Sequence, residues 1–194
     1  ITLSSVLVSV LICFVIGVPL GVIASYNKWY RDIQNVVLDA MQTLPYFCYL
    51  IPVLMFFGGN IVSAVIATVI YSVPPIIRLT ALGLSQVSGT YSEVSKSFGG
   101  TGIQTLNKVK FPLAVPSLVM GFNQTVIMAF AMQIVTPLIG GKGLGLQVFN
   151  ALQRSDTGRG LSAGLAIVLL AIIIDRITHA WTKKQRQALG LDKS

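Results

Sequence analysis

The stretch from residue 40 to residue 77 reads AMQTLPYFCYLIPVLMFFGGNIVSAVIATVIYSVPPII and contains no Asp, Glu, Lys or Arg. Gly58-Gly59-Asn60 near its centre is typical of a tight turn between two apolar segments. About 18 apolar residues are enough to cross a hydrocarbon core of about 30 Å as a helix. The stretch therefore predicts a hairpin of two membrane-crossing helices.

Three further stretches without charge lie outside this hairpin, at residues 1–27, 111–141 and 160–174. Of the 194 residues, 54% are hydrophobic and only 10% are charged, and the mean hydropathy is +0.77. A soluble domain carries about 25% charged residues. A soluble globular enzyme, a disordered chain and a disulfide-stapled domain are therefore excluded, and we predict an all-α, polytopic membrane helix bundle.

Five transmembrane helices follow from these runs. They are expected at residues 2–24, 33–57, 61–82, 112–139 and 160–181. Prolines occur within the expected spans at positions 45, 52, 74, 75 and 137. Irregular backbone at membrane depth is tolerated where it is buried in protein or lines a cavity, which suits a transporter. Because Ile1 lies inside an apolar run, we also expect the natural chain to extend upstream.

The distribution of Lys and Arg predicts the orientation. The formal net charge is +8, which in a soluble protein would suggest a nucleic-acid surface. Eleven of the 14 basic residues fall on one side of the expected spans, so the positive-inside rule applies and no nucleic-acid partner is expected. Residues 25–32, residues 83–110 and the C-terminus are placed in the cytoplasm, and residues 58–60 and 140–160 outside, as in a multi-pass protein of the bacterial plasma membrane.

Catalytic and metal-binding patterns are missing from the sequence. The one histidine, His179, rules out an HExxH zinc site. The glycine-rich loop at residues 140–145 has Gly143 after Lys142, where a phosphate-binding loop needs Ser or Thr, so we expect a flexible re-entrant turn there. Cys13 and Cys48 lack CxxC or Cys/His neighbours and are expected to be small apolar side chains. We expect no catalytic residue, metal or cofactor in this chain, and any ATP site on another chain.

Polar residues at membrane depth are costly, and they therefore mark candidate functional positions. Asp39 and Arg78 lie at similar depth near the cytoplasmic side, and an ion pair would neutralise both. Alternatively, Asp39 lines a translocation path. The candidate residues for the path or its gate are Asp39, Gln42, Thr43, Pro45, Asn123, Gln124 and Gln133. The last three are equally compatible with hydrogen bonding between helices.

The cytoplasmic segment at residues 83–111 is too long for a simple connection and too short for a separate domain. Ser92 and Glu93 are expected to open a short helix with a carboxylate in its first turn. Gly99 is expected to end that helix with a positive φ, and an amphipathic piece follows at residues 103–110. The alternative is an interfacial loop that only anchors the bundle.

This segment resembles the signature of permease subunits of binding-protein-dependent ABC importers. That signature is Glu-Ala-Ala, three residues, Gly, nine residues and Ile-x-Leu-Pro. The chain has Glu93-Val94-Ser95, three residues, Gly99, nine residues and Val109-Lys110-Phe111-Pro112. The spacing is the same, and the exchanged residues are small or apolar.

Longer stretches resemble one branch, the glycine betaine/proline permeases, which transport quaternary-ammonium osmolytes. The similar stretches are LDAMQTLP at 38–45, VPPIIRLT at 73–80, GFNQT at 121–125, GLG at 143–145 and LAIIIDRIT at 170–178. The run from Gln133 to Leu138 departs from the expected aliphatic pattern. The substrate implied is therefore glycine betaine, proline or a related methylated amine such as choline, carnitine or trimethylamine N-oxide.

The resemblance implies a type I ABC importer permease core, with residues 1–194 as a single transmembrane domain. It implies a second copy of the permease, a cytoplasmic ABC ATPase dimer that holds ATP and Mg, and an extracytoplasmic substrate-binding protein. Segment 83–111 would dock on the ATPase as a coupling helix. The coupling residues implied are Glu93, Val94, Ser95, Lys96, Phe98, Gly99 and Pro112.

Two other classes of function compete with this interpretation. An ion-coupled secondary transporter with Asp39 as its coupling carboxylate would show inverted repeats, and none is visible in the sequence. A structural subunit of a membrane complex would leave the signature between Glu93 and Pro112 unexplained.

Overall fold

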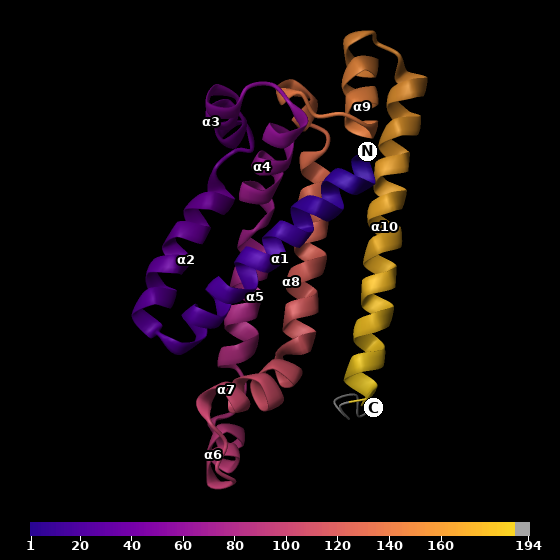
Figure 1. Cartoon of the computed structure of the whole chain (residues 1–194). Coiled ribbons are helices and arrows are strands. Elements are labelled where there is room, and N and C mark those ends of the chain that lie inside the picture. The colour runs from indigo at the N-terminus through magenta and orange to yellow at the C-terminus, as the bar shows by residue number, and fades with distance from the viewer. Residues whose placement is uncertain (189–194) are drawn as a thin grey trace.

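The computed structural model describes residues 1–188, which are helical with no strand among them; Lys193, one of the expected cytoplasmic cations, lies outside them. Figure 1 shows an elongated bundle in which α6 projects at one end and α3 and α9 lie at the other. The elements are α1 Thr2–Tyr26, α2 Lys28–Thr43, α3 Phe47–Phe57, α4 Ile61–Ser72, α5 Pro74–Ser85, α6 Gly89–Ser97, α7 Gly102–Thr105, the π-helical η1 Leu106–Lys110, α8 Phe111–Met132, the 3₁₀ turn η2 Thr136–Ile139, α9 Leu144–Gln153 and α10 Thr157–Ala188.

Four helical stretches are long and apolar enough to cross a membrane, which confirms the all-α membrane bundle. They are Thr2–Tyr26, Ile61–Ser85, Gly102–Met132 and Thr157–Ala180. The expected span at 33–57 is instead two helices, α2 and α3, with a bend of 94° between them. Five spans are therefore present only if this bent pair is counted as one.

The bend has a local cause at Pro45. Proline donates no backbone hydrogen bond, and it pushes the residue before it out of the helical region. Leu44 accordingly has an extended backbone, with φ −69° and ψ 132°. The helix ends there, and α3 starts in a new direction.

The prolines of the third expected span break it more gently. Pro74 and Pro75 occupy the first turn of α5, where a missing N–H group costs nothing. The break falls at Val73, and α4 and α5 together still form one membrane span of 25 residues.

The fourth span differs from its expected bounds of 112–139. Thr101 and Gln104 form a reciprocal capping box, so the helix begins at Gly102. The expected separate piece at 103–110 is the beginning of this span, continued through η1 into α8. The span ends at Met132, and Pro137 lies in the 3₁₀ turn that follows.

Small residues bring α1, α5 and α8 together in the centre of the bundle. A Cβ atom added at Gly21 of α1 would lie 2.6 Å from the Cβ of Thr80. One added at Gly83 of α5 would lie 2.6 Å from the Cβ of Ser117 on α8. Close backbone approach of this kind is how membrane helices gain packing energy without a hydrophobic driving force. The core at this level includes the buried side chains of Cys13, Ile76, Leu84, Ala114 and Leu118.

Candidate functional site

The segment at residues 83–111 contains a helix, α6, that begins earlier than the sequence predicted. It starts at Gly89, where the Ser88 hydroxyl accepts a hydrogen bond of 3.4 Å from the amide of Thr90. Glu93 therefore lies in the middle of the helix, and no acidic residue occupies its first turn. The prediction that Ser92 and Glu93 open the helix is wrong, because the Ser88 cap adds a turn before them.

The end of α6 is the glycine turn that the sequence predicted. Gly99 has φ +78°, and its amide donates to the Lys96 carbonyl at 2.8 Å. The next amide, that of Gly100, donates to the Ser95 carbonyl at 2.9 Å. A Cβ added at Gly99 would meet nothing within 4 Å. Within this chain, glycine at position 99 allows the positive φ of a helix-ending turn, and no close contact requires it.

The α6 helix lies outside the membrane spans and still has large exposed apolar side chains. Phe98 is 88% exposed, and Tyr91 and Val94 are 54% and 50% exposed. Glu93 and Lys96 are also exposed, and no residue of α6 is buried. Exposed apolar side chains gathered on one short element indicate a surface for a protein partner.

The α6 helix is tied to the beginning of the fourth span. The Ser95 and Thr105 hydroxyl oxygens lie 2.8 Å apart. A hollow of ≈ 430 Å³ between the two elements is lined by Val94, Phe98, Gln104 and other residues. Pro112 lies in the first turn of α8, directly after η1. The α6 helix is therefore in direct contact with the beginning of the fourth span.

The structure brings Asp39 of α2 and Arg78 of α5 together. The Arg78 Nη2 atom donates to the Asp39 Oδ1 atom at 2.6 Å. The Asp39 side chain is 63% exposed and that of Arg78 is 37% exposed. Both line a polar hollow of ≈ 400 Å³ between α2 and α5, together with Arg31, Asn35 and Ser85. The ion pair therefore lies at a partly exposed hollow between the two helices.

The other candidate path residues on α2 lie near its end. Gln42, Thr43 and Pro45 are exposed, and the Thr43 hydroxyl donates to the Ala40 carbonyl at 3.0 Å. Among the described residues, no hydrogen bond joins them to the Asp39–Arg78 pair. The structure assigns them to the bend between α2 and α3.

The remaining candidate path residues, Asn123, Gln124 and Gln133, have three different environments. Gln133 is buried, and its Oε1 atom accepts a hydrogen bond of 3.0 Å from Ser5 of α1. Asn123 is buried, and neither polar atom of its amide has a partner among the described residues. Gln124 is exposed. Within this chain, the seven candidate path residues therefore have different surroundings, and their role in a path stays a prediction.

The glycine-rich loop at residues 140–145 is a closely packed connection instead of the expected flexible turn. The Leu144 amide donates to the Thr2 hydroxyl at 2.7 Å. A Cβ added at Gly145 would lie 1.8 Å from the carbonyl oxygen of Gln133. The loop backbone is thus in contact with α1 and with the end of the fourth span, which leaves no open cradle for phosphate.

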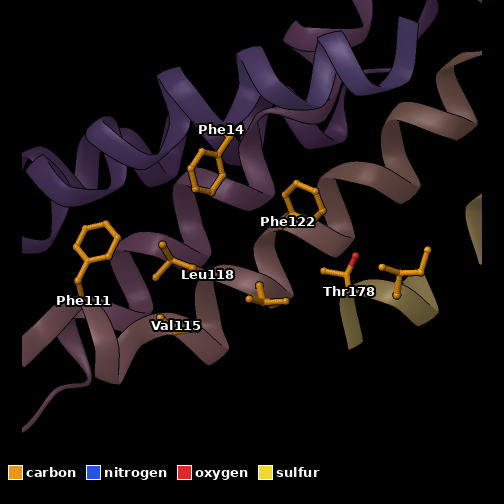
Figure 2. Close-up of a pocket in the computed structure, with 8 residues that line it drawn as sticks. Phe14, Phe111, Val115, Leu118, Phe122 and Thr178 are labelled. Atoms are coloured by element: carbon orange, nitrogen blue, oxygen red, sulfur yellow. The ribbon is translucent and has the colours of Figure 1, made fainter. Parts of the chain in front are cut away.

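An apolar groove of ≈ 460 Å³ lies between α1, α8 and α10. Figure 2 shows Phe14, Phe111, Leu118 and Phe122 around it, with Thr178 on its α10 side. The Thr178 hydroxyl donates to the Ile174 carbonyl at 2.7 Å within its own helix. The groove offers hydrocarbon contact and is unsuited to a polar solute.

Sequence reasoning missed the aromatic side chains around the bend between α2 and α3. Tyr46 and Phe47 have ring centroids 4.6 Å apart, and Tyr49 lies edge-on to Tyr71 at 6.1 Å. The available signal was the position of three aromatic residues directly after Pro45. Among the residues that the structure describes, no group of His, Cys, Asp or Glu could hold a metal ion.

The sequence is similar to a known protein family and to named transport permeases. Residues 17–187 match the family model described as "Binding-protein-dependent transport system inner membrane component". The chain is 46% identical to the glycine betaine/carnitine transport permease protein GbuB of Listeria monocytogenes, over 95% of this chain and 66% of that protein. It is 44% identical to the glycine betaine/proline betaine transport system permease protein ProW of Escherichia coli, over 96% of this chain and 52% of that protein.

A solved structure has the same fold. It is an inward-facing conformation of the MetNI methionine ABC transporter, which aligns with a TM-score of 0.81 at 23% identity. The alignment covers 95% of this chain and 92% of that one. The chain spans between about half and two thirds of the two curated relatives. It is a multi-pass membrane protein that belongs to the family of inner-membrane components of binding-protein-dependent transport systems.

Proposed function

We propose that this chain is the translocation subunit of an ABC importer for glycine betaine, proline or a related methylated amine such as choline, carnitine or trimethylamine N-oxide. The observation that carries the proposal is α6, a short exposed helix with Phe98 at its tip, connected through η1 to a membrane span. The names of the relatives support the substrate class, since GbuB and ProW are glycine betaine permeases.

The proposal includes the partners that such a subunit needs. Two copies of the permease assemble with a cytoplasmic ABC ATPase dimer, and ATP and Mg are held by that dimer. An extracytoplasmic binding protein delivers the small-molecule substrate to the outer surface. The assembly resides in the bacterial inner membrane with the C-terminus of this chain in the cytoplasm, which the excess of Lys and Arg on that side supports.

The coupling surface comprises Glu93, Val94, Ser95, Lys96, Phe98 and Gly99, with Pro112 at the beginning of α8. Closure of the ATPase dimer displaces α6, and the contact between Ser95 and Thr105 carries the displacement into the fourth span. The bundle then alternates between inward-open and outward-open states. An ion-coupled carrier would leave the apolar surface of α6 without a role.

Uptake by the purified complex in proteoliposomes tests the proposal. The permease, ATPase and binding protein are reconstituted and supplied with radiolabelled glycine betaine, proline, choline, carnitine and trimethylamine N-oxide in turn. Uptake of at least one of them into the vesicle is expected only for complexes whose ATPase faces the lumen. ATP must then be enclosed in the vesicle, and the binding protein must be outside. Uptake that follows an imposed ion gradient without ATP would establish the secondary-transporter alternative.

A further inference from the structure

The bend between α2 and α3 places the end of one helix beside the beginning of another. The α2 helix ends at Thr43 and α3 begins at Phe47, with 94° between them. In Figure 1 the bend lies on the α3 side of the bundle, away from α6. Tyr46 already has a right-handed helical backbone, so the change of direction is confined to Leu44 and Pro45.

Four aromatic side chains surround this bend, and we call them the aromatic elbow: Tyr46, Phe47, Tyr49 and Tyr71. The Tyr49 amide donates to the Tyr46 carbonyl at 3.1 Å, so the backbone between them is turned as in a helix. Residues three apart on such a turn lie on the same side. Tyr49 in turn contacts Tyr71 of α4 edge-on. Rings from two different helices thus line one side of the bend.

The rings are held in place and remain accessible within this chain. The Tyr49 hydroxyl donates to the carbonyl of Met41, which fixes the direction of that ring. Tyr46 is 39% exposed and Phe47 is 47% exposed. The aromatic elbow therefore has ring surface that the helices of this chain do not cover.

The last carbonyl groups of α2 lie at the same bend. Pro45 has no N–H group to bond to the Met41 carbonyl, which accepts from the Tyr49 hydroxyl instead. The amides of Tyr46 and Phe47 make no backbone hydrogen bond to the carbonyls of Gln42 or Thr43. These carbonyls end a helix of 16 residues. The C-terminal end of a helix carries a partial negative charge that favours a cation.

The bend has no fixed positive charge of its own. No Lys or Arg occurs between residues 40 and 77, and Arg78 is paired with Asp39. A quaternary ammonium group has no N–H to donate, so it is bound through ring faces and weakly through carbonyl oxygens. The aromatic elbow supplies ring faces and free carbonyls together, without a competing cation.

We propose that the aromatic elbow is a substrate site within the permease, where Tyr46, Phe47, Tyr49 and Tyr71 bind the quaternary ammonium group. This inference deepens the proposed function and rests on it for the identity of the substrate. It assigns a selective step to the membrane subunit in addition to selection by a binding protein. The competing occupant of the same surface is the second permease copy, which would cover the rings with apolar side chains.

Paired substitutions that keep or remove the ring test the site by transport. In the reconstituted complex, Tyr46→Phe and Tyr71→Phe retain the π face and are expected to keep kcat/KM for glycine betaine near the wild-type value. Tyr46→Leu and Tyr71→Leu remove it and are expected to lower kcat/KM about tenfold, the range of a desolvated cation–π contact. Phe56→Leu is the matched control, because Phe56 is 85% exposed at the other end of α3, and it is expected to change nothing.

The native Cys48 provides a direct measure of binding, because it lies between Phe47 and Tyr49 and is exposed, whereas Cys13 is buried. Tetramethylammonium chloride is expected to slow alkylation of Cys48 in the wild-type complex, relative to the same concentration of sodium chloride. The protection is expected to persist in Tyr46→Phe and to disappear in Tyr46→Leu. Mass spectrometry of the modified peptide gives the rate.

The outcomes separate this site from the proposed function. Equal transport by the Leu and Phe variants, or a Cys48 that does not react in the assembled complex because the second copy covers it, would overturn the aromatic elbow. A wild-type complex that imports no methylated amine would overturn the proposed substrate class. Protection of Cys48 by tetramethylammonium in that same complex would still support the site.

Discussion

At the scale of single residues, the Asp39–Arg78 contact has the most direct consequence. Asp39→Asn removes the carboxylate and leaves Arg78 without its ionic partner. Solvated ion pairs contribute about 0–1 kcal/mol, and an uncompensated buried charge costs more. Because both side chains are partly exposed, we expect a loss of about 1 kcal/mol. The thermal midpoint of the detergent-purified complex gives the stability, and glycine betaine uptake gives the activity.

The double variant is the control for this pair. Asp39→Asn combined with Arg78→Gln removes both charges and is expected to recover part of the lost stability. If the double variant is no more stable than the less stable single variant, the two side chains do not stabilise each other. A role for Asp39 as lining of the translocation path would then be favoured.

At the scale of elements, Gly99 determines how α6 ends. Gly99→Leu puts a branched side chain at φ +78°, a conformation that costs about 1–3 kcal/mol. No atom lies within 4 Å of the added Cβ, so the cost falls on the turn itself and changes the direction of Phe98. We expect normal membrane insertion with loss of coupling, measured as reduced uptake per ATP hydrolysed by the purified complex.

Two substitutions check that interpretation of Gly99. Gly99→Asn is expected to retain more coupling than Gly99→Leu, because Asn tolerates a positive φ better than other residues with a Cβ. Substitution of Lys142, in the loop packed against Thr2, is expected to leave ATPase docking unchanged. Normal uptake and normal substrate-stimulated ATPase activity in Gly99→Leu would refute the role of α6 in coupling.

The sequence predicted the elements whose cause is local. Membrane spans were predictable because the apolar runs have the length that a bilayer requires, and the glycine turn at Gly99 was predictable because few residues adopt its φ. The beginning of α6 was missed, since Ser88 followed by Gly89 is typical of a loop as well as of a helix cap. A serine cap is recognised only once the helix after it is known.

Most features that depend on distant residues were not predictable, and the Asp39–Arg78 contact is the exception. A proline in a membrane span often causes only a kink, so the sequence did not show that Pro45 ends α2 with a bend of 94°. The hydrogen bond between Ser5 and Gln133 joins residues 128 positions apart. The contact of Asp39 with Arg78 could be predicted, because two opposite charges at one membrane depth have few other partners.

At the scale of the whole molecule, the orientation in the membrane can be tested by cysteine labelling. Arg154, exposed after α9, is expected to lie outside the cell. Arg154→Cys in a chain that lacks Cys13 and Cys48 is expected to react with a membrane-impermeant thiol reagent in intact cells. Lys28→Cys, at the beginning of α2, is the matched control and is expected to react only after permeabilisation. The opposite pattern would invert the proposed topology.

The stretch Gly102–Met132 has a mechanical consequence at this scale. Its 31 residues form a single helical rod of about 46 Å, with α6 attached at one end and the hydrogen bond from Ser5 to Gln133 just beyond the other. If α6 docks on the ATPase as proposed, such a rod would work as a lever that carries a displacement of the α6 end to the opposite end of the span. The π-helical turn Leu106–Lys110 lies near its loaded end, where an irregular turn is the natural point of compliance. Stiffness at that one turn would then determine how much of the displacement reaches the far end.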